Sequence, residues 1–104
     1  VTGTELDLNA NSTNDAYGVF VVGTADISID SLTGFPSHFE KVILKPAVGR
    51  EINYVTTTPS ADGQLVDNLG VATTIYGNTG DYAIIEKCVS GGFNCYRITA
   101  VISY

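Results

Sequence analysis

Turn-forming residues interrupt this 104-residue chain at short and regular intervals. Clusters of Gly, Asn, Asp and Pro recur roughly every eight to twelve residues, and the stretches between them are rich in β-branched and aromatic side chains. No window of ten or more residues carries apolar side chains at the spacing of an amphipathic helix. Short strands separated in this way are typical of sandwiches and barrels. The pattern therefore predicts an all-β protein.

We predict a single compact antiparallel β-sandwich, jelly-roll-like, with about eight short strands and little or no helix. A chain of this length fits one domain, residues 1–104. Gly, Pro and Asn predict loops at Ser31–Ser37, Pro59–Gly63 and Gly77–Gly80. The expected strands are Thr4–Asn9, Tyr17–Val22, Ala25–Asp30, Phe39–Pro46, Glu51–Thr57, Val71–Tyr76, Asp81–Cys88 and Asn94–Ser103.

The two cysteines flank a predicted hairpin and have six residues between them. A register that places Cys88 opposite Cys95 predicts a disulfide between them. A disulfide in turn implies an oxidising compartment. Two alternatives stay open, a pair of reduced thiols and a metal or redox site, for which His38 is the only imidazole. The other pairs in this register are chemically matched: Glu86 with Arg97, Ile85 with Ile98, Ile84 with Thr99, and Ala83 with Ala100.

The charge balance excludes two classes of partner. The formal net charge is −6, with only five Lys and Arg residues, so nucleic acids and anionic lipids repel the chain. No apolar run approaches the ~20 residues that cross a bilayer, and we expect no membrane insertion. Charged residues make up 15 % of the chain, so Thr, Ser, Asn and Gly must supply the polar surface. Such a surface is common on secreted and virion proteins.

The sequence contains no recognisable catalytic motif. A Ser–His pair would need an oriented nucleophile beside His38, and the chain has no Gly-x-Ser-x-Gly turn. The spacing of its eleven carboxylates selects no catalytic pair. Calcium bound at Asp26 and Asp30, or at Asp62 and Asp67, is an alternative without an EF-hand loop to support it. We expect no enzyme, no catalytic residue, no metal and no cofactor.

Four segments carry a family resemblance. They are Lys41–Gly49, an apolar strand with a basic end and a Gly turn; Ile52–Thr58, which is Thr-rich; Gly80–Glu86, a Gly-Asp start before an apolar strand; and Gly91–Tyr96, a Gly-rich turn entering the last strand. From about Ala25 to Ile98, their order resembles a small β-domain of bacteriophage tail fibres, tail spikes and capsid-decorating proteins. Where that pattern carries Trp before Tyr, this chain has Cys95. The resemblance implies a β-sandwich that associates about a three-fold axis.

The resemblance also implies a function, which we state as an expectation. The chain would be a virion structural protein, foremost a capsid decoration (cement) protein that stabilises the phage head by contacts between capsomers. Its partners would be the major capsid protein or other virion subunits, and it would form a homotrimer on the virion surface. Alternatives are a tail-fibre or receptor-binding module, a subunit of an extracellular surface filament or pilus, and a carbohydrate-binding adhesion module. The last would stack sugars on Tyr17, Tyr54, Tyr76, Tyr82 or Tyr96.

Residues 1–15 are expected to form an N-terminal arm or an edge strand. Alternating apolar residues at Leu6 and Leu8 would suit addition to the sheet edge of a neighbouring subunit. The same pattern fits an edge strand of the chain's own domain. Other candidate partner contacts are Phe20, Phe35, Phe39 and Tyr104, and core packing is the alternative for each.

Overall fold

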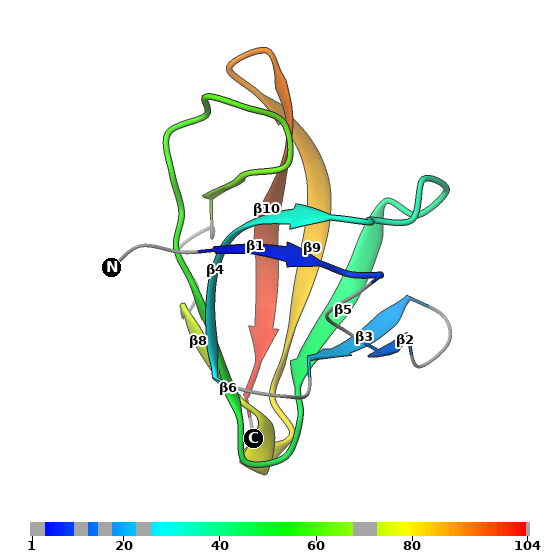
Figure 1. The fold of residues 1–104 in the computed structure, drawn as a ribbon, viewed down its shortest axis with the longest axis vertical. Coiled ribbons are helices and arrows are strands. Elements are labelled where there is room, and N and C mark those ends of the chain that lie inside the picture. The colour runs from blue at the N-terminus through cyan, green and yellow to red at the C-terminus, as the bar shows by residue number, and fades with distance from the viewer. Residues whose placement is uncertain (1–3, 10–12, 15–17, 23–25, 68–72, 104) are drawn as a thin grey trace.

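The computed structural model describes residues 4–9, 13–14, 18–22, 26–67 and 73–103, which form two facing β-sheets (Figure 1). The all-β sandwich is confirmed, and the helical element among these residues is a single 3-10 turn, η1 (Gly77–Thr79). The four-stranded sheet has the order β1 (Thr4–Asp7), β4 (Ile27–Thr33), β6 (Glu51–Tyr54), β8 (Thr74–Tyr76). The six-stranded sheet has the order β2 (Thr13–Asn14), β3 (Val19–Val22), β5 (Lys41–Pro46), β9 (Tyr82–Ser90), β10 (Phe93–Ile102), β7 (Leu65–Asp67).

The sheets are mixed, which corrects the prediction of an antiparallel, jelly-roll-like sandwich. The chain alternates between the sheets from β3 to β6. In this stretch, strands two apart in the sequence lie side by side in one sheet and run the same way, whereas β6 and β8 are antiparallel. Accordingly β3 is parallel to β5, and β4 is parallel to β6. The pairs β1–β4 and β7–β10 are also parallel, whereas β9 is antiparallel to both β5 and β10.

Two strands, β4 and β7, differ from the prediction. The expected loop from Ser31 begins as strand, because β4 continues to Thr33 and places Leu32 in the core opposite Leu6. The short strand β7 was not expected, since its three residues follow directly on a turn signal. The tight turn at the end of the β9–β10 hairpin is confirmed, with positive φ at both Gly91 and Gly92.

Alternating side chains of both sheets meet in one core. In β3, β5 and β6 every second residue is buried, as the period-two pattern of a half-buried strand requires. The buried apolar residues are Leu6, Leu8, Phe20, Val22, Ile29, Leu32, Val42, Leu44, Ile52, Tyr54, Leu65, Ile75, Ala83, Ile85 and Ile98. Their burial from both sheets is the main apolar contribution to folding.

The described part of residues 1–15 belongs to the domain's own sandwich. β1 lies at the edge of the four-stranded sheet, and the Leu8 backbone N–H donates to the Thr33 carbonyl at 2.9 Å. Leu6 and Leu8 are 0 % and 1 % exposed, and Phe20 on β3 is 3 % exposed. These three side chains are therefore core residues, which corrects their prediction as partner contacts.

The segment 59–64 joins the two sheets through the backbone of one glycine. The Gly63 N–H donates to the Asn94 carbonyl of β10, and the Gly63 carbonyl accepts from the Leu32 N–H of β4, both at 2.8 Å. Gly63 has φ +92°, and a Cβ there would lie 2.9 Å from the Leu32 oxygen. Only glycine fits this connection without strain. The predicted turn at Pro59–Gly63 is thus also a bridge between the sheets.

The hydroxyl group of Tyr54 is buried in the core without a hydrogen-bond partner among the described residues. The Tyr54 side chain is 3 % exposed. Desolvation by this burial raises the pKa of the Tyr54 hydroxyl far above its ordinary value of 10.0. The hydroxyl therefore stays protonated in the folded chain under alkaline conditions that ionise it in the unfolded chain.

Replacing Leu6 tests whether β1 is a core strand. Leu6→Ala should lower the free energy of unfolding by about 2–5 kcal/mol, because it leaves a cavity between the sheets. Urea denaturation followed by circular dichroism measures the change. Glu5→Ala on the same strand, where the side chain is exposed, is the control and should change stability by less than about 0.5 kcal/mol. Equal stability of Leu6→Ala and the parent would instead indicate a dispensable arm.

Removing the Tyr54 hydroxyl should stabilise the fold. Tyr54→Phe is expected to raise the free energy of unfolding by about 1 kcal/mol at neutral pH, because it removes a buried unpaired polar group. The folded-state pKa is raised, so the stability that protonation contributes is complete below about pH 10 and is lost above it, at about 1.4 kcal/mol per pH unit. Tyr54→Phe should therefore also flatten the alkaline decline. Tyr82→Phe is the control, and a less stable Tyr54→Phe protein would contradict the prediction.

Candidate docking surface

The face of the six-stranded sheet that points away from the core carries an apolar row. Val19 of β3, Ile43 of β5, Ile84 of β9 and Ala100 of β10 are neighbours in register across four strands. All four are half-buried, whereas the residues beside them in β3, β5 and β9 are buried in the core. We call these residues the apolar row. An outward sheet face is ordinarily polar, so this row is a candidate site of contact with another protein.

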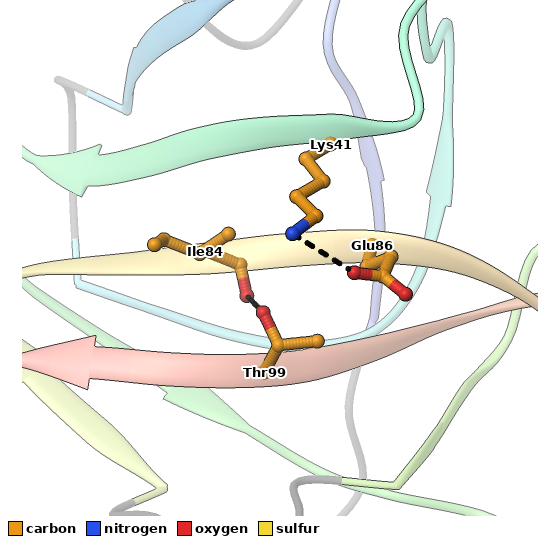
Figure 2. Close-up of polar contacts among 4 residues, drawn as sticks. All are labelled: Lys41, Ile84, Glu86 and Thr99. Atoms are coloured by element: carbon orange, nitrogen blue, oxygen red, sulfur yellow. Dashed lines mark hydrogen bonds and ion pairs between the residues drawn. The ribbon is translucent and has the colours of Figure 1, made fainter.

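A β-bulge at Thr99 completes the row. The predicted register holds from Cys88–Cys95 through Ile85–Ile98, but Ile84 then pairs with Ala100. This corrects the predicted pairs Ile84–Thr99 and Ala83–Ala100, because the bulge adds one residue to β10. Figure 2 shows the Thr99 hydroxyl directed at the Ile84 carbonyl, 3.5 Å away.

The bulge also decides which side chains of β10 enter the core. Beyond it, Val101 pairs with the buried Ala83 and packs against the core, and Ile102 pairs with Tyr82 on the outer face. An unbroken ladder would place the smaller Ala100 inside and Val101 outside. The bulge therefore turns the larger apolar side chain, Val101, toward the core and leaves alanine opposite Ile84.

A row of alternating charge runs beside the apolar row. Lys41, Glu86, Arg97 and Asp67 are neighbours in register on β5, β9, β10 and β7. The Lys41 ammonium lies 3.4 Å from the Glu86 carboxylate (Figure 2). The Lys41 side chain is 60 % exposed, so this pair contributes less than about 1 kcal/mol.

The two cysteines lie at the other end of this face. Cys88 and Cys95 are directly opposite each other on β9 and β10, as predicted. Opposed residues of an antiparallel pair have Cα atoms about 4.5–5.5 Å apart, within the range that a disulfide spans. Both are free thiols in the structure, Cys88 half-buried and Cys95 buried. The structure thus brings the pair together, and the bond between them stays a prediction.

The surroundings of the two thiols differ. The Cys95 sulfur lies 3.9 Å from the Ala61 carbonyl, beneath the loop that precedes Gly63. Burial, followed by the neighbouring Cys88 and Asp62, raises the pKa of the Cys95 thiol. Cys88, through a side-chain hydrogen bond and then its charge, raises the pKa of Arg97; desolvation opposes this, and Asp67 and Glu86 add to it. Cys88 is half-buried and therefore closer to solvent than the buried Cys95.

The remaining predicted contact residues are not on the apolar row. Phe35 and Phe39 are half-buried in the loop after β4 and pack against the core. The Phe35 ring stacks on Tyr96 with centroids 4.8 Å apart, and the Lys87 ammonium lies 5.1 Å from the Phe35 centroid. Tyr104 falls outside the described residues. Sequence reasoning missed the apolar row because apolar residues occur on both faces of these strands, and the sequence does not show which face packs against the core.

The structure brings no metal-binding cluster together in the described ranges. His38 is exposed and contacts the Phe39 ring. No three His, Cys, Asp or Glu side chains of these ranges gather as a metal site. The acids considered for calcium are engaged separately: Asp26 accepts from the Glu51 N–H, Asp30 from the Ser31 hydroxyl, and Asp62 from the Asn94 N–H. The described chain also contains no helix long and apolar enough to span a bilayer.

Comparison with models of known protein families, with curated proteins and with solved structures finds no match for this chain. Its function must therefore be inferred from the sequence resemblance and from the chemistry of its surfaces.

Oxidation of the cysteine pair can be measured directly. Protein purified without reductant should have an intact mass about 2 Da below that of the reduced protein, because closing one disulfide removes two hydrogens. The closed loop is short, so oxidation should add about 2–3 kcal/mol to the free energy of unfolding. The Cys88→Ala, Cys95→Ala double variant is the control and should show no such difference. Full alkylation of both thiols without reductant would contradict the disulfide.

Proposed function

We propose that this chain is a virion structural protein that acts as a capsid decoration protein. The observation that supports the proposal is the apolar row on the outward face of the six-stranded sheet, bordered by charges of alternating sign. Burying such a row against another subunit removes apolar surface from water, and the charges set the register of contact. The sequence resemblance to phage decoration and fibre domains favours a virion over other extracellular assemblies.

The proposed occupant of the apolar row is another copy of this chain in a trimer. The trimer would then span neighbouring capsomers of the phage head. A protein that binds only the assembled shell stabilises that shell by mass action, so the shell withstands a higher internal pressure. This role requires a stiff scaffold and a matched surface. The two sheets and their bridge at Gly63 provide the scaffold.

A charge placed in the apolar row should dissociate the trimer. Ile84→Lys is expected to convert a trimeric protein into a monomer, because a buried unpaired ammonium costs several kcal/mol in an interface. Size-exclusion chromatography with light scattering measures the mass, and the unfolding temperature shows that the variant is folded. Val48→Lys is the matched control, since Val48 is 87 % exposed on the turn after β5.

The location of the protein separates the alternatives. An antibody against this chain, applied to particles from the source culture and viewed by electron microscopy, should label phage heads at regular positions. Label at tail tips would favour a fibre module, and label along cell-surface filaments would favour a pilus subunit. A parent protein that remains a monomer at high concentration would contradict the trimer.

A further inference from the structure

The outward face of the four-stranded sheet carries a polar groove with an aromatic side chain at one end. One depression of about 300 Å³ is lined by Asp26, Ile27, Ser28, Glu51, Asn53 and Thr74. A second, of about 180 Å³, is lined by Asp26, Gly49, Arg50, Glu51, Tyr76 and Asn78. Asp26 and Glu51 line both, so the two form one groove, which we call the β6–β8 groove. The strands β6 and β8, which supply Glu51, Asn53, Thr74 and Tyr76, are neighbours in the four-stranded sheet (Figure 1).

Hydrogen bonds fix the polar groups of the groove. Glu51 pairs with Tyr76, and Asn53 pairs with Thr74, in the antiparallel ladder of β6 and β8. The Thr74 hydroxyl donates to the Asn53 carboxamide oxygen at 2.9 Å. This bond orients the amide group and leaves its N–H₂ to donate elsewhere. The Asp26 carboxylate accepts the Glu51 backbone N–H at 3.1 Å, which holds Asp26 beside Glu51. The groove is therefore preorganised by its own strands.

A close backbone approach brings the second half of the groove together. The Gly77 N–H donates to the Arg50 carbonyl at 2.7 Å. A Cβ at Gly77 would lie 1.8 Å from the Ala47 carbonyl oxygen, so no other residue allows the turn after β5 to come this near. Arg50, Tyr76 and Asn78 together line this half of the groove.

The side chains of the groove combine a ring with planar hydrogen-bonding groups. Tyr76 is 48 % exposed. Among the described residues, the large apolar side chains that are strongly exposed are Val48, Tyr76 and Val89, and of these Tyr76 is aromatic. Within the described chain, neither Arg50 nor Glu51 has a side-chain hydrogen bond or an ion pair. Carboxylates accept hydrogen bonds from hydroxyl groups, and the Asn53 amide and Arg50 guanidinium donate to them. An aromatic face packs against an apolar ring surface.

We infer that the β6–β8 groove binds a neutral carbohydrate. A sugar ring has an apolar C–H face for Tyr76 and a rim of hydroxyls for Asp26, Glu51 and Asn53. The two carboxylates beside one guanidinium disfavour an anionic ligand. The polar lining also disfavours an apolar peptide. The inference goes beyond the proposed structural role, because a subunit that docks through the six-stranded sheet presents this groove on its opposite layer.

The test measures glycan binding by the full chain and needs no virion. Labelled protein is applied to an array of neutral, sialylated and sulfated oligosaccharides, and hits are titrated with the soluble sugar by heteronuclear NMR. Binding of neutral oligosaccharides, with shifts at the Asn53 side-chain amide, is expected. Tyr76→Ala should weaken binding about tenfold, and Tyr76→Phe should retain it, because stacking needs the ring and not the hydroxyl. Glu51→Gln should weaken binding as well.

The controls keep the outcome interpretable. Val89→Ala alters another strongly exposed apolar residue, on the β9–β10 hairpin, and should leave glycan binding unchanged. Each variant is checked for an unchanged unfolding temperature. Absence of any neutral glycan bound at millimolar concentration, binding only to sulfated or sialylated glycans, or equal binding by folded Tyr76→Ala would overturn the inference. None of these results bears on the trimer or on the location of the protein, so failure here is separate from failure of the proposed function.

Discussion

The backbone connection at Gly63 is the constraint on which the sandwich depends. Its N–H and carbonyl bond to β10 and β4, so one residue ties the six-stranded sheet to the four-stranded sheet. The neighbouring residue extends the tie, because Gln64 bridges Ser31 and its carbonyl accepts from the Tyr96 N–H. Core packing resists displacement of the sheets through interdigitated side chains, and the hydrogen bonds of Gly63 add directional contacts. Backbone hydrogen bonds to both sheets fix their relative position, and they also hold the loop that covers Cys95.

The two outward faces of the sandwich differ in their surface chemistry. Successive side chains of a strand point to opposite sides, so one sequence of alternate residues builds the core and the other is open to a separate use. On β5 the outward residue Ile43 belongs to the apolar row, whereas on β6 the outward residues Glu51 and Asn53 line the polar groove. Contact with a protein and contact with a hydrated ligand need opposite surface chemistry. The core of the sandwich lies between the two faces on which we propose these contacts.

Local patterns predicted the strands and the β9–β10 hairpin, because β-propensity, turn residues and side-chain matching act between near neighbours. The Cys88–Cys95 register is such a case, and it holds until Thr99. Nothing in the residues around Thr99 indicates the bulge, which turns the partly buried Val101 toward the core. No local pattern records the direction of pairing between strands separated by a strand of the other sheet, since β3 and β5 are parallel whereas β6 and β8 are antiparallel. The groove was missed for the same reason, because residues 26, 51 and 74 meet only in the folded sheet, although Tyr76 was among the tyrosines considered for sugar stacking.

The position of β1 also bears on how an assembly of this chain can form. Donating β1 to a neighbouring subunit would withdraw Leu6 and Leu8, which are almost fully buried in the parent core. Each loss costs about 2–5 kcal/mol unless the neighbour supplies an equivalent pocket, as in a domain swap. Contact through the apolar row needs no such exchange, because its side chains already point outward while their strands stay paired. Assembly by a preformed face is therefore favoured over assembly by an arm.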